Sequence, residues 1–202
     1  MTIGALKVLD QNPNGFYLMA EGGAVDWMAH ANNMPRFIEE QRDFDQAVAA
    51  VIDWVEENSN WQETLLIVTS DHETGGIWGA GTFRNGKGGP VATERTEEAV
   101  EAARFDPRED TFQDFRAVQN RGAGRLPDYQ WASGNHTNDL VPLWALGAAA
   151  AQFAEFTRTD RNAADLWGRK YGWNGDYVDN TGLFHVMHEA FLADAARQAT
   201  AQ

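Results

Sequence analysis

The thirteen residues from Thr64 to Gly76 read TLLIVTSDHETGG, and this stretch does most to decide the fold. Its first half is a continuous apolar run, which is typical of a strand buried on both faces of a sheet. The run ends in Asp71 and His72 and then in two glycines, so the chain leaves the sheet through a polar turn. We therefore expect a strand over about 64–70 with ionisable side chains at its carboxyl end.

Two further apolar runs have the same character. Phe16–Ala20 directly precedes Glu21, and Leu140–Leu146 follows a polar segment that contains His136. Both runs are short enough for strands and are flanked by turn-forming residues. We expect each of them to be a buried strand.

Helical patterns separate these runs. They cover 2–11, 24–30, a long segment that begins near Asn33 and Pro35, and a last amphipathic helix capped by Asn180-Thr181. In the long segment, apolar residues recur at helical spacing from 37 to 55. Buried strands that alternate with helices predict an α/β fold, here a three-layer α/β/α sandwich around a mostly parallel sheet with one antiparallel strand.

Residues 79–130 differ from the rest of the sequence. Gly, Pro and charged residues dominate this segment, and helical patterns appear only near 94–104 and 108–119. We interpret it as an excursion from the core. The prediction is therefore a single domain over 1–202 with a variable excursion at about 79–130.

The composition excludes several kinds of site and partner. The chain has a net charge of −14 and no Lys/Arg cluster, which argues against nucleic acid and anionic membranes as partners. It has no cysteine, so His, Asp and Glu must hold any metal ion. No run of about 18 apolar residues is present to span a bilayer, and the first residues lack the pattern of a signal peptide.

Potential metal ligands gather at the ends of the predicted strands. Ligands of α/β sheets bind beyond the carboxyl ends of the strands. If 24–30 is helical, its i, i+4 spacing places an aspartate and a histidine on one face, as two ligands of one ion require. The candidate ligands are Glu21, Asp26, His30, Asp71, His72 and His136.

The position of His136 predicts the direction of one strand. His136 precedes its strand, whereas Glu21, Asp71 and His72 follow theirs. The histidine can reach the same edge of the sheet most simply if the 140–146 strand runs antiparallel to the other two. The alternative is a parallel strand with a return loop of about 20 Å.

Each motif also has a purely structural explanation. The Asp-x3-His pair could lie on the surface, the Asp-His pair could cap the next turn, and the loop histidine could simply be exposed. Their coincidence at strand ends favours a shared site. His185 and His188, at i, i+3 on the last helix, are interpreted as packing or surface histidines.

Four segments resemble the alkaline phosphatase family, in the family's order and at similar intervals. They are GFYLMAEG at 15–22 with Asp26 and His30-Ala31-Asn32, TSDHETGG at 69–76, His136-Thr137 with Val141-Pro142-Leu143, and Asp179-Asn180-Thr181 with Phe184-His185. The resemblance runs from about residue 1 to 195 and is weakest across 79–130.

The resemblance implies a role for each candidate ligand. It assigns Asp26, His30 and His136 to one zinc ion, Asp71 and His72 to a second zinc, and Glu21 to a neighbouring magnesium. Donor chemistry agrees, because imidazole with carboxylate suits Zn²⁺ and carboxylate with water suits Mg²⁺. Two zinc ions about 4 Å apart can hold the attacking and leaving oxygens of a displacement at phosphorus.

The implied activity is hydrolysis of small phosphate monoesters, but no catalytic residue is identified in the chain. The family uses a serine nucleophile in its N-terminal half, and no corresponding segment is found here. We therefore expect a partial alkaline phosphatase-like domain that is inactive in isolation. By resemblance, the whole protein would be periplasmic or extracellular and could form a homodimer.

Two other interpretations remain open. The chain could be a non-catalytic metal-binding fragment or pseudoenzyme of the same superfamily. Related metal ligands also occur in sulfatases, phosphodiesterases and cofactor-independent mutases, although the Asp-x3-His and DHETGG segments favour the phosphatase branch.

Overall fold

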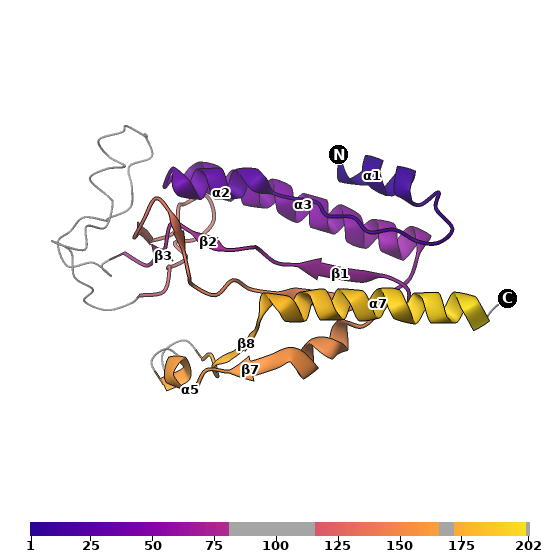
Figure 1. The fold of residues 1–202 in the computed structure, drawn as a ribbon. Helices are drawn as coiled ribbons and strands as arrows, with labels where there is room; N and C mark the ends of the chain where they lie inside the picture. The colour runs from indigo at the N-terminus through magenta and orange to yellow at the C-terminus, as the bar shows by residue number, and fades with distance from the viewer. Residues whose placement is uncertain (81–115, 166–171, 201–202) are drawn as a thin grey trace. The chain divides into compact units, whose positions relative to one another are not determined.

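The computed structural model describes residues 1–80, 116–165 and 172–200 (Figure 1). These residues form two compact units. The first unit comprises Met1–Val51 and Ser70–Val141, and the second comprises Ile52–Thr69 and Pro142–Gln202. Most of the predicted excursion, with its helical patterns near 94–104 and 108–119, lies outside the described residues.

The first unit contains three helical segments and two small antiparallel sheets. Strand β2 pairs with β5, and β3 pairs with β4. Glu73 and Thr74 lie opposite Thr137 and His136 in the first of these sheets. The elements are α1 (Thr2–Leu9), α2 (Gly23–His30), the part of α3 (Met34–Asn58) up to Val51, β2 (Glu73–Thr74), β3 (Ile77–Trp78), β4 (Gln130–Trp131) and β5 (His136–Thr137).

Local chemistry explains where α3 begins. The backbone N–H of Arg36 donates to the side-chain oxygen of Asn33 at 3.2 Å, so Asn33 caps the first turn. Pro35 follows in that turn, where the missing N–H has no helical partner to lose. The predicted long helix is confirmed over Met34–Asn58.

An aromatic cluster forms the core of the first unit. Trp131 is fully buried and packs edge-on against Phe37 and Tyr129, with ring centroids 5.9 and 6.2 Å apart. Ala29, at the end of α2, belongs to the same core. The core therefore fixes the end of α2 next to the strand that carries Trp131.

Gly75 is required where the chain passes this core. Its φ of +95° lies in a region that L side chains rarely adopt, and a Cβ at this position would collide with the ring of Trp131. The backbone N–H groups of Ala132 and Ser133 both donate to the Gly75 carbonyl at 3.0 Å. The glycine thus lets the segment after β4 bind to the turn after β2.

The second unit contains two antiparallel strand pairs and a long helix. Strand β1 pairs antiparallel with β6, with Leu65 opposite Gly147 and Val68 opposite Trp144. β7 and β8 form a second antiparallel pair that leads into α7, drawn from orange to yellow in Figure 1. The elements are β1 (Leu65–Val68), β6 (Trp144–Gly147), η1 (Ala150–Phe156), β7 (Thr157–Thr159), α5 (Arg161–Ala163), β8 (Asp176–Val178) and α7 (Asn180–Thr200).

Two details of the second unit bear on the sequence predictions. The predicted reversal of the third apolar run relative to the second is confirmed by the β1–β6 pairing. The last helix is also confirmed, but its cap is Asp179, whose carboxylate accepts from the Thr181 N–H at 3.0 Å, and not Asn180-Thr181.

The strand predicted over Phe16–Ala20 is wrong, because this segment has no regular structure. Tyr17 is 57% exposed and Met19 is 73% exposed. An apolar run predicts burial, but a strand also needs a neighbour that satisfies its N–H and C=O groups. Among the described residues every sheet has two antiparallel strands, so these sheets give no support to a mostly parallel sheet.

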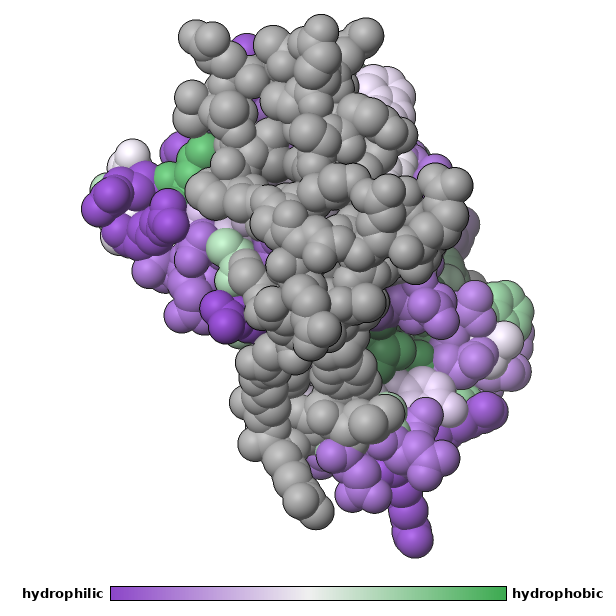
Figure 2. All heavy atoms as spheres, turned by 90° about the vertical axis from the view of Figure 1, so that its left-hand side faces the viewer, coloured by the Kyte–Doolittle hydropathy of each residue, from purple (hydrophilic) through white to green (hydrophobic). Residues whose placement is uncertain are grey.

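Hydrophilic side chains predominate over the described part of the face shown in Figure 2, with small hydrophobic patches between them. This agrees with the net charge of −14. Within the residues that the structure describes, no helix has the length and apolar character needed to cross a membrane.

Candidate metal centre

Helix α2 presents the first two candidate ligands. Asp26 and His30 lie one turn apart, and Asp26 Oδ2 is 3.5 Å from His30 Nε2. The helix can approach α3 closely because it follows Gly22, where a Cβ would lie only 2.9 Å from the ring of Phe44. The predicted helical spacing thus brings Asp26 and His30 together.

His136 reaches the same place through strand pairing. It begins β5 and lies opposite Thr74 of β2. Its Nε2 atom is 3.1 Å from His30 Nε2 and 3.7 Å from Asp26 Oδ1. Asp26, His30 and His136, here called the triad, offer ligand atoms that all lie within 4.8 Å of one another.

The spacing within the triad fits a tetrahedral metal ion. Zn–N and Zn–O bonds of about 2.0–2.1 Å at tetrahedral angles place neighbouring ligand atoms about 3.3 Å apart. The two histidine Nε2 atoms lie 3.1 Å apart, and the Asp26 carboxylate faces both of them, with Oδ2 3.5 Å from His30 Nε2 and Oδ1 3.7 Å from His136 Nε2. The side chains of the triad are 34–49% exposed, so a fourth position is open to solvent or substrate.

Asp71 and His72, here called the pair, adjoin the triad. Asp71 Oδ2 lies 3.3 Å from His72 Nε2, again a suitable separation for two ligands of one ion. The His72 ring stacks on the His136 ring with centroids 3.5 Å apart. Five of the six candidate ligands therefore form one continuous cluster.

Within the described part of the chain, no hydrogen bond or ion pair joins Glu21 to this cluster. Its carboxylate lies against the start of α2, where a Cβ on Gly23 would be 3.0 Å from Oε1. Among the described residues, no hydrogen bond or ion pair holds this exposed carboxylate. Glu21 thus lies just before α2, and its predicted role as a ligand stays a prediction.

Residues 1–164 match the family described as alkaline phosphatase. The chain belongs to the alkaline phosphatase family. Alkaline phosphatase 4 of Bacillus subtilis (strain 168) is 30% identical over 182 residues, which cover 76% of this chain and 39% of the relative. For alkaline phosphatase 3 of the same organism the identity is 29%, with 76% and 40% covered. The chain thus spans about two fifths of the length of these curated relatives.

A solved structure of the alkaline phosphatase from the Antarctic bacterium TAB5 is also similar. It is 26% identical to this chain, with a TM-score of 0.46, and the match covers 74% of this chain and 33% of the solved one.

In this alkaline phosphatase family member, a backbone contact orients His30, the first histidine among the candidate ligands. The carbonyl of Gly134 accepts a hydrogen bond from His30 Nδ1 at 2.7 Å. A carbonyl cannot donate, so Nδ1 carries the proton, and Nε2 is the ring nitrogen that faces Asp26 and His136. Such outer contacts commonly fix the ring orientation of metal-binding histidines.

Asn32 holds the loop that supplies this carbonyl. It is fully buried and adopts a φ of +50°, a conformation that asparagine tolerates better than most residues. Its side-chain amide donates to the carbonyls of Ala29 at 3.0 Å and Ser133 at 2.7 Å. Asn32 therefore joins the end of α2 to the loop before His136.

Glu73 and Thr74 are further residues of the site that the sequence predictions did not single out. Glu73 accepts hydrogen bonds from the Gly76 N–H and the Thr137 hydroxyl, and so fixes the β2–β5 pairing that carries His136. Thr74 lies on the side of β2 that faces the ligands. The available signal was their position directly after Asp71-His72 in a predicted strand-to-turn transition.

The remaining two histidines, interpreted above as packing or surface residues, contact aromatic rings. His185 stacks on Phe156 with centroids 5.5 Å apart, and His188 stacks on Phe184 at 5.8 Å. His188 also lies 4.0 Å from Glu189. Both are exposed on α7.

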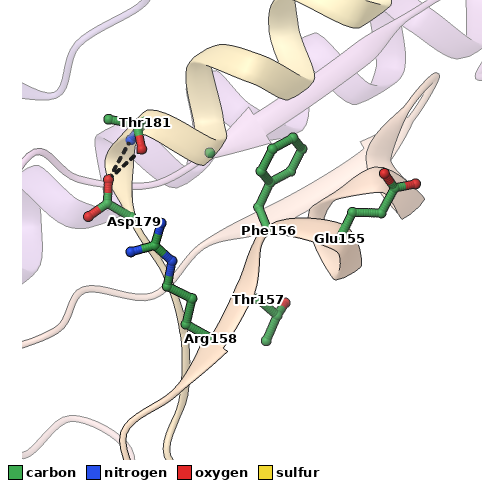
Figure 3. Close-up of a pocket in the computed structure, with 7 residues that line it drawn as sticks. Glu155, Phe156, Thr157, Arg158, Asp179 and Thr181 are labelled. Carbon is green, nitrogen blue, oxygen red and sulfur yellow. Dashed lines mark hydrogen bonds between the residues drawn. The ribbon is translucent and has the colours of Figure 1, made fainter.

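A small cavity of about 120 Å³ lies in the second unit, at the N-terminal end of α7 (Figure 3). Arg158 extends toward Asp179, whose carboxylate accepts hydrogen bonds from the hydroxyl and N–H of Thr181. The hydroxyl contact, above all, lowers the pKa of Asp179. None of the candidate metal ligands lines this cavity.

Proposed function

We propose that this chain supplies most ligands of a two-zinc, one-magnesium centre that hydrolyses phosphate monoesters. The observation that carries the proposal is the convergence of Asp26, His30 and His136, whose ligand atoms all lie within 4.8 Å of one another. Membership of the alkaline phosphatase family supports the reaction type.

Within this centre, the triad would hold one zinc and the pair the other. Zinc bound there would supply Lewis-acid stabilisation of the charge that develops on oxygen during phosphoryl transfer. The chain's own residues orient these ligands: Gly134 fixes the ring of His30, and the β2–β5 ladder positions His136. Glu21 would serve the magnesium, for which a carboxylate oxygen is a suitable ligand.

The nucleophile of the proposed reaction would be a serine outside these residues. The chain has three serines, and each is hydrogen-bonded locally: Ser59 to Thr64, Ser70 to the His72 carbonyl, and Ser133 to the Asn135 N–H. This arrangement favours an incomplete catalytic set in the chain by itself. It also supports the alternative, a non-catalytic metal-binding fragment or pseudoenzyme.

The wider family context suggests how the whole protein would be built and used. We propose that these elements belong to a three-layer α/β/α sandwich whose central sheet is mostly parallel and is completed by further sequence. Its substrates would be small phosphate monoesters. The whole protein would act in the periplasm or outside the cell, and it could form a homodimer.

Zinc titration of the metal-free chain tests the proposed centre. We expect saturable binding of zinc, loss of the tighter binding event in His30→Ala, and unchanged binding in the surface control His188→Ala. We also expect inorganic phosphate to bind the zinc-loaded chain and not the metal-free chain, as followed by ³¹P NMR. Absence of saturable zinc binding, or equal binding by His30→Ala, would contradict the proposal.

A further inference from the structure

The hydroxyl of Thr74 contacts both halves of the cluster. It lies 2.6 Å from Asp26 Oδ1, in the triad, and 3.2 Å from His72 Nδ1, in the pair. Thr74 is only 8% exposed, so solvent has little access to compete for these contacts. One small side chain therefore links the triad to the pair.

The number of protons available fixes the direction of both hydrogen bonds. A hydroxyl has one hydrogen, and the carboxylate of Asp26 can only accept it. The hydroxyl oxygen is then left with lone pairs toward His72 Nδ1, so this ring nitrogen must be the donor. His72 thereby becomes the Nδ1–H tautomer, and its Nε2 lone pair is directed to the side where Asp71 Oδ2 lies 3.3 Å away.

The backbone holds Thr74 in this position. Thr74 lies opposite His136 in the β2–β5 ladder, and residues two apart on an extended segment point to the same side, which places His72 and Thr74 together. The next side chain, Glu73, bonds to the Gly76 N–H and the Thr137 hydroxyl. The β2–β5 pairing and the hydrogen bonds of Glu73 thus hold Thr74 in place.

We propose that Thr74 is a positioning residue that sets the tautomer of His72 and the orientation of Asp26, and so prepares both metal-binding halves together. For His30 the same task is done by the main chain, through the carbonyl of Gly134. For His72 the task depends on a single hydroxyl. The consequence for metal affinity rests on the proposed function, whereas the tautomer assignment does not.

Long-range ¹H–¹⁵N NMR spectra of the metal-free chain test the tautomer directly. At about pH 8.5, where an ordinary imidazole is neutral, we expect His72 to be the Nδ1–H form in the wild type and in Thr74→Ser. In Thr74→Val, which has the same shape without the hydroxyl, we expect the proton to move largely to Nε2. An Nε2–H tautomer in the wild type, or no change in Thr74→Val, would overturn the proposal.

Zinc titration then separates this inference from the proposed function. We expect Thr74→Val to weaken zinc binding about 10- to 100-fold, the usual effect of removing an outer contact, and Thr74→Ser to remain within about 3-fold of the wild type. Thr181→Val, which removes another hydroxyl from a carboxylate, is the matched control and should leave zinc binding unchanged. A wild type that binds no zinc would overturn the proposed centre, and the NMR result would still decide the role of Thr74. Equal zinc binding by Thr74→Val and Thr74→Ser would count against that role.

Discussion

The triad and the pair are adjacent but differ in how much of a metal site each provides. The triad draws three ligands from α2 and β5, and backbone groups orient one of its rings. The pair offers two neighbouring residues of one turn, and its Asp71 side chain is 83% exposed. Structural zinc sites usually have four protein ligands and catalytic ones three. The triad therefore offers as many candidate ligands as a catalytic zinc site uses, whereas the pair offers one fewer.

The difference shows that ligand identity alone does not make a site. Asp26 and His30 are held by a helix that packs against α3, whereas Asp71 lies in a turn and forms hydrogen bonds to its neighbours, the Ser70 hydroxyl and the His72 N–H. A preorganised set of ligands costs little to order when the metal binds. We thus expect the triad to dominate metal binding by this chain.

The largest expected effect concerns catalysis. If the pair is incomplete and no serine is free to attack, the purified 202-residue chain should hydrolyse no p-nitrophenyl phosphate above a zinc-only control. The release of nitrophenolate at saturating zinc and magnesium measures this. Turnover on the order of 1 per second or more, as enzymes show, would mean that the chain is catalytically self-sufficient and that the distinction between its two sites is wrong.

The second effect ranks the two sites directly. His136→Ala removes a ligand of the triad and should weaken the tightest zinc binding by more than about 100-fold, beyond the usual effect of losing an outer contact. His72→Ala should change it by less than about 10-fold, because the triad stays whole. Competition with a chromophoric chelator provides the affinities. The reverse ranking would assign the tighter site to Asp71 and His72.

The third effect concerns the support of the triad. Asn32→Ala removes two buried hydrogen bonds and places alanine at a φ of +50°, so the free energy of unfolding should fall by about 1–3 kcal/mol. Urea denaturation measures it. Asn32→Gly loses the same bonds without the backbone strain, so it should be the less destabilised of the two variants. A wild-type midpoint for both would show that the loop after Trp131 does not depend on Asn32.

The smallest effect uses a threonine–carboxylate contact outside the candidate metal centre. Asp179 and Thr181 are joined by a hydroxyl bond of 2.6 Å, the same length as the bond from Thr74 to Asp26. In Thr181→Val the pKa of Asp179 should rise toward its ordinary value of 3.8, because the hydroxyl that stabilises the carboxylate is gone. Because the pKa of Asp179 is lowered in the folded protein, the ionised carboxylate adds stability that is fully present above pH 3.8. This stability is lost as the pH falls through the lowered pKa of the folded protein. Thr181→Val should therefore be less stable than the wild type above pH 3.8 and equally stable below the lowered pKa. NMR titration of the Asp179 carboxyl carbon tests the change, and an unaltered pKa would show that the hydroxyl has no such influence.

Much of the secondary structure could be predicted from local patterns. The long α3 follows from its apolar stripe and the Asn33 cap, and the antiparallel direction of β6 follows from the need to bring His136 to the strand ends. The strand predicted over Phe16–Ala20 failed because apolar sequence reports a tendency to be buried and says nothing about which strand would pair with it. Pairing partners are a property of the whole sheet.

In the candidate site too, local geometry could be predicted from the sequence, whereas contacts between distant residues could not. The i, i+4 spacing of Asp26 and His30 was enough to place them together, since a helix fixes that geometry locally. The roles of Asn32 and Thr74 could not be predicted, because their partners lie 101 and 48 residues away along the chain. Threonine and asparagine form local hydrogen bonds in many turns, so their residue type alone does not indicate a distant partner.

The strand β6 has a practical consequence for handling this protein. Every second residue of β6 is exposed, and two of these are the hydrophobic residues Trp144 and Leu146, which are 62% and 47% exposed. One side of the β1–β6 ribbon therefore presents hydrophobic side chains to the solvent. Mutual repulsion from a net charge of −14 keeps separate chains apart, and salt weakens that repulsion as the Debye length shrinks from about 30 Å at 0.01 M to about 3 Å at 1 M. Concentrated buffers should therefore promote clustering of the chains, and dilute ones should preserve a clear, monodisperse solution.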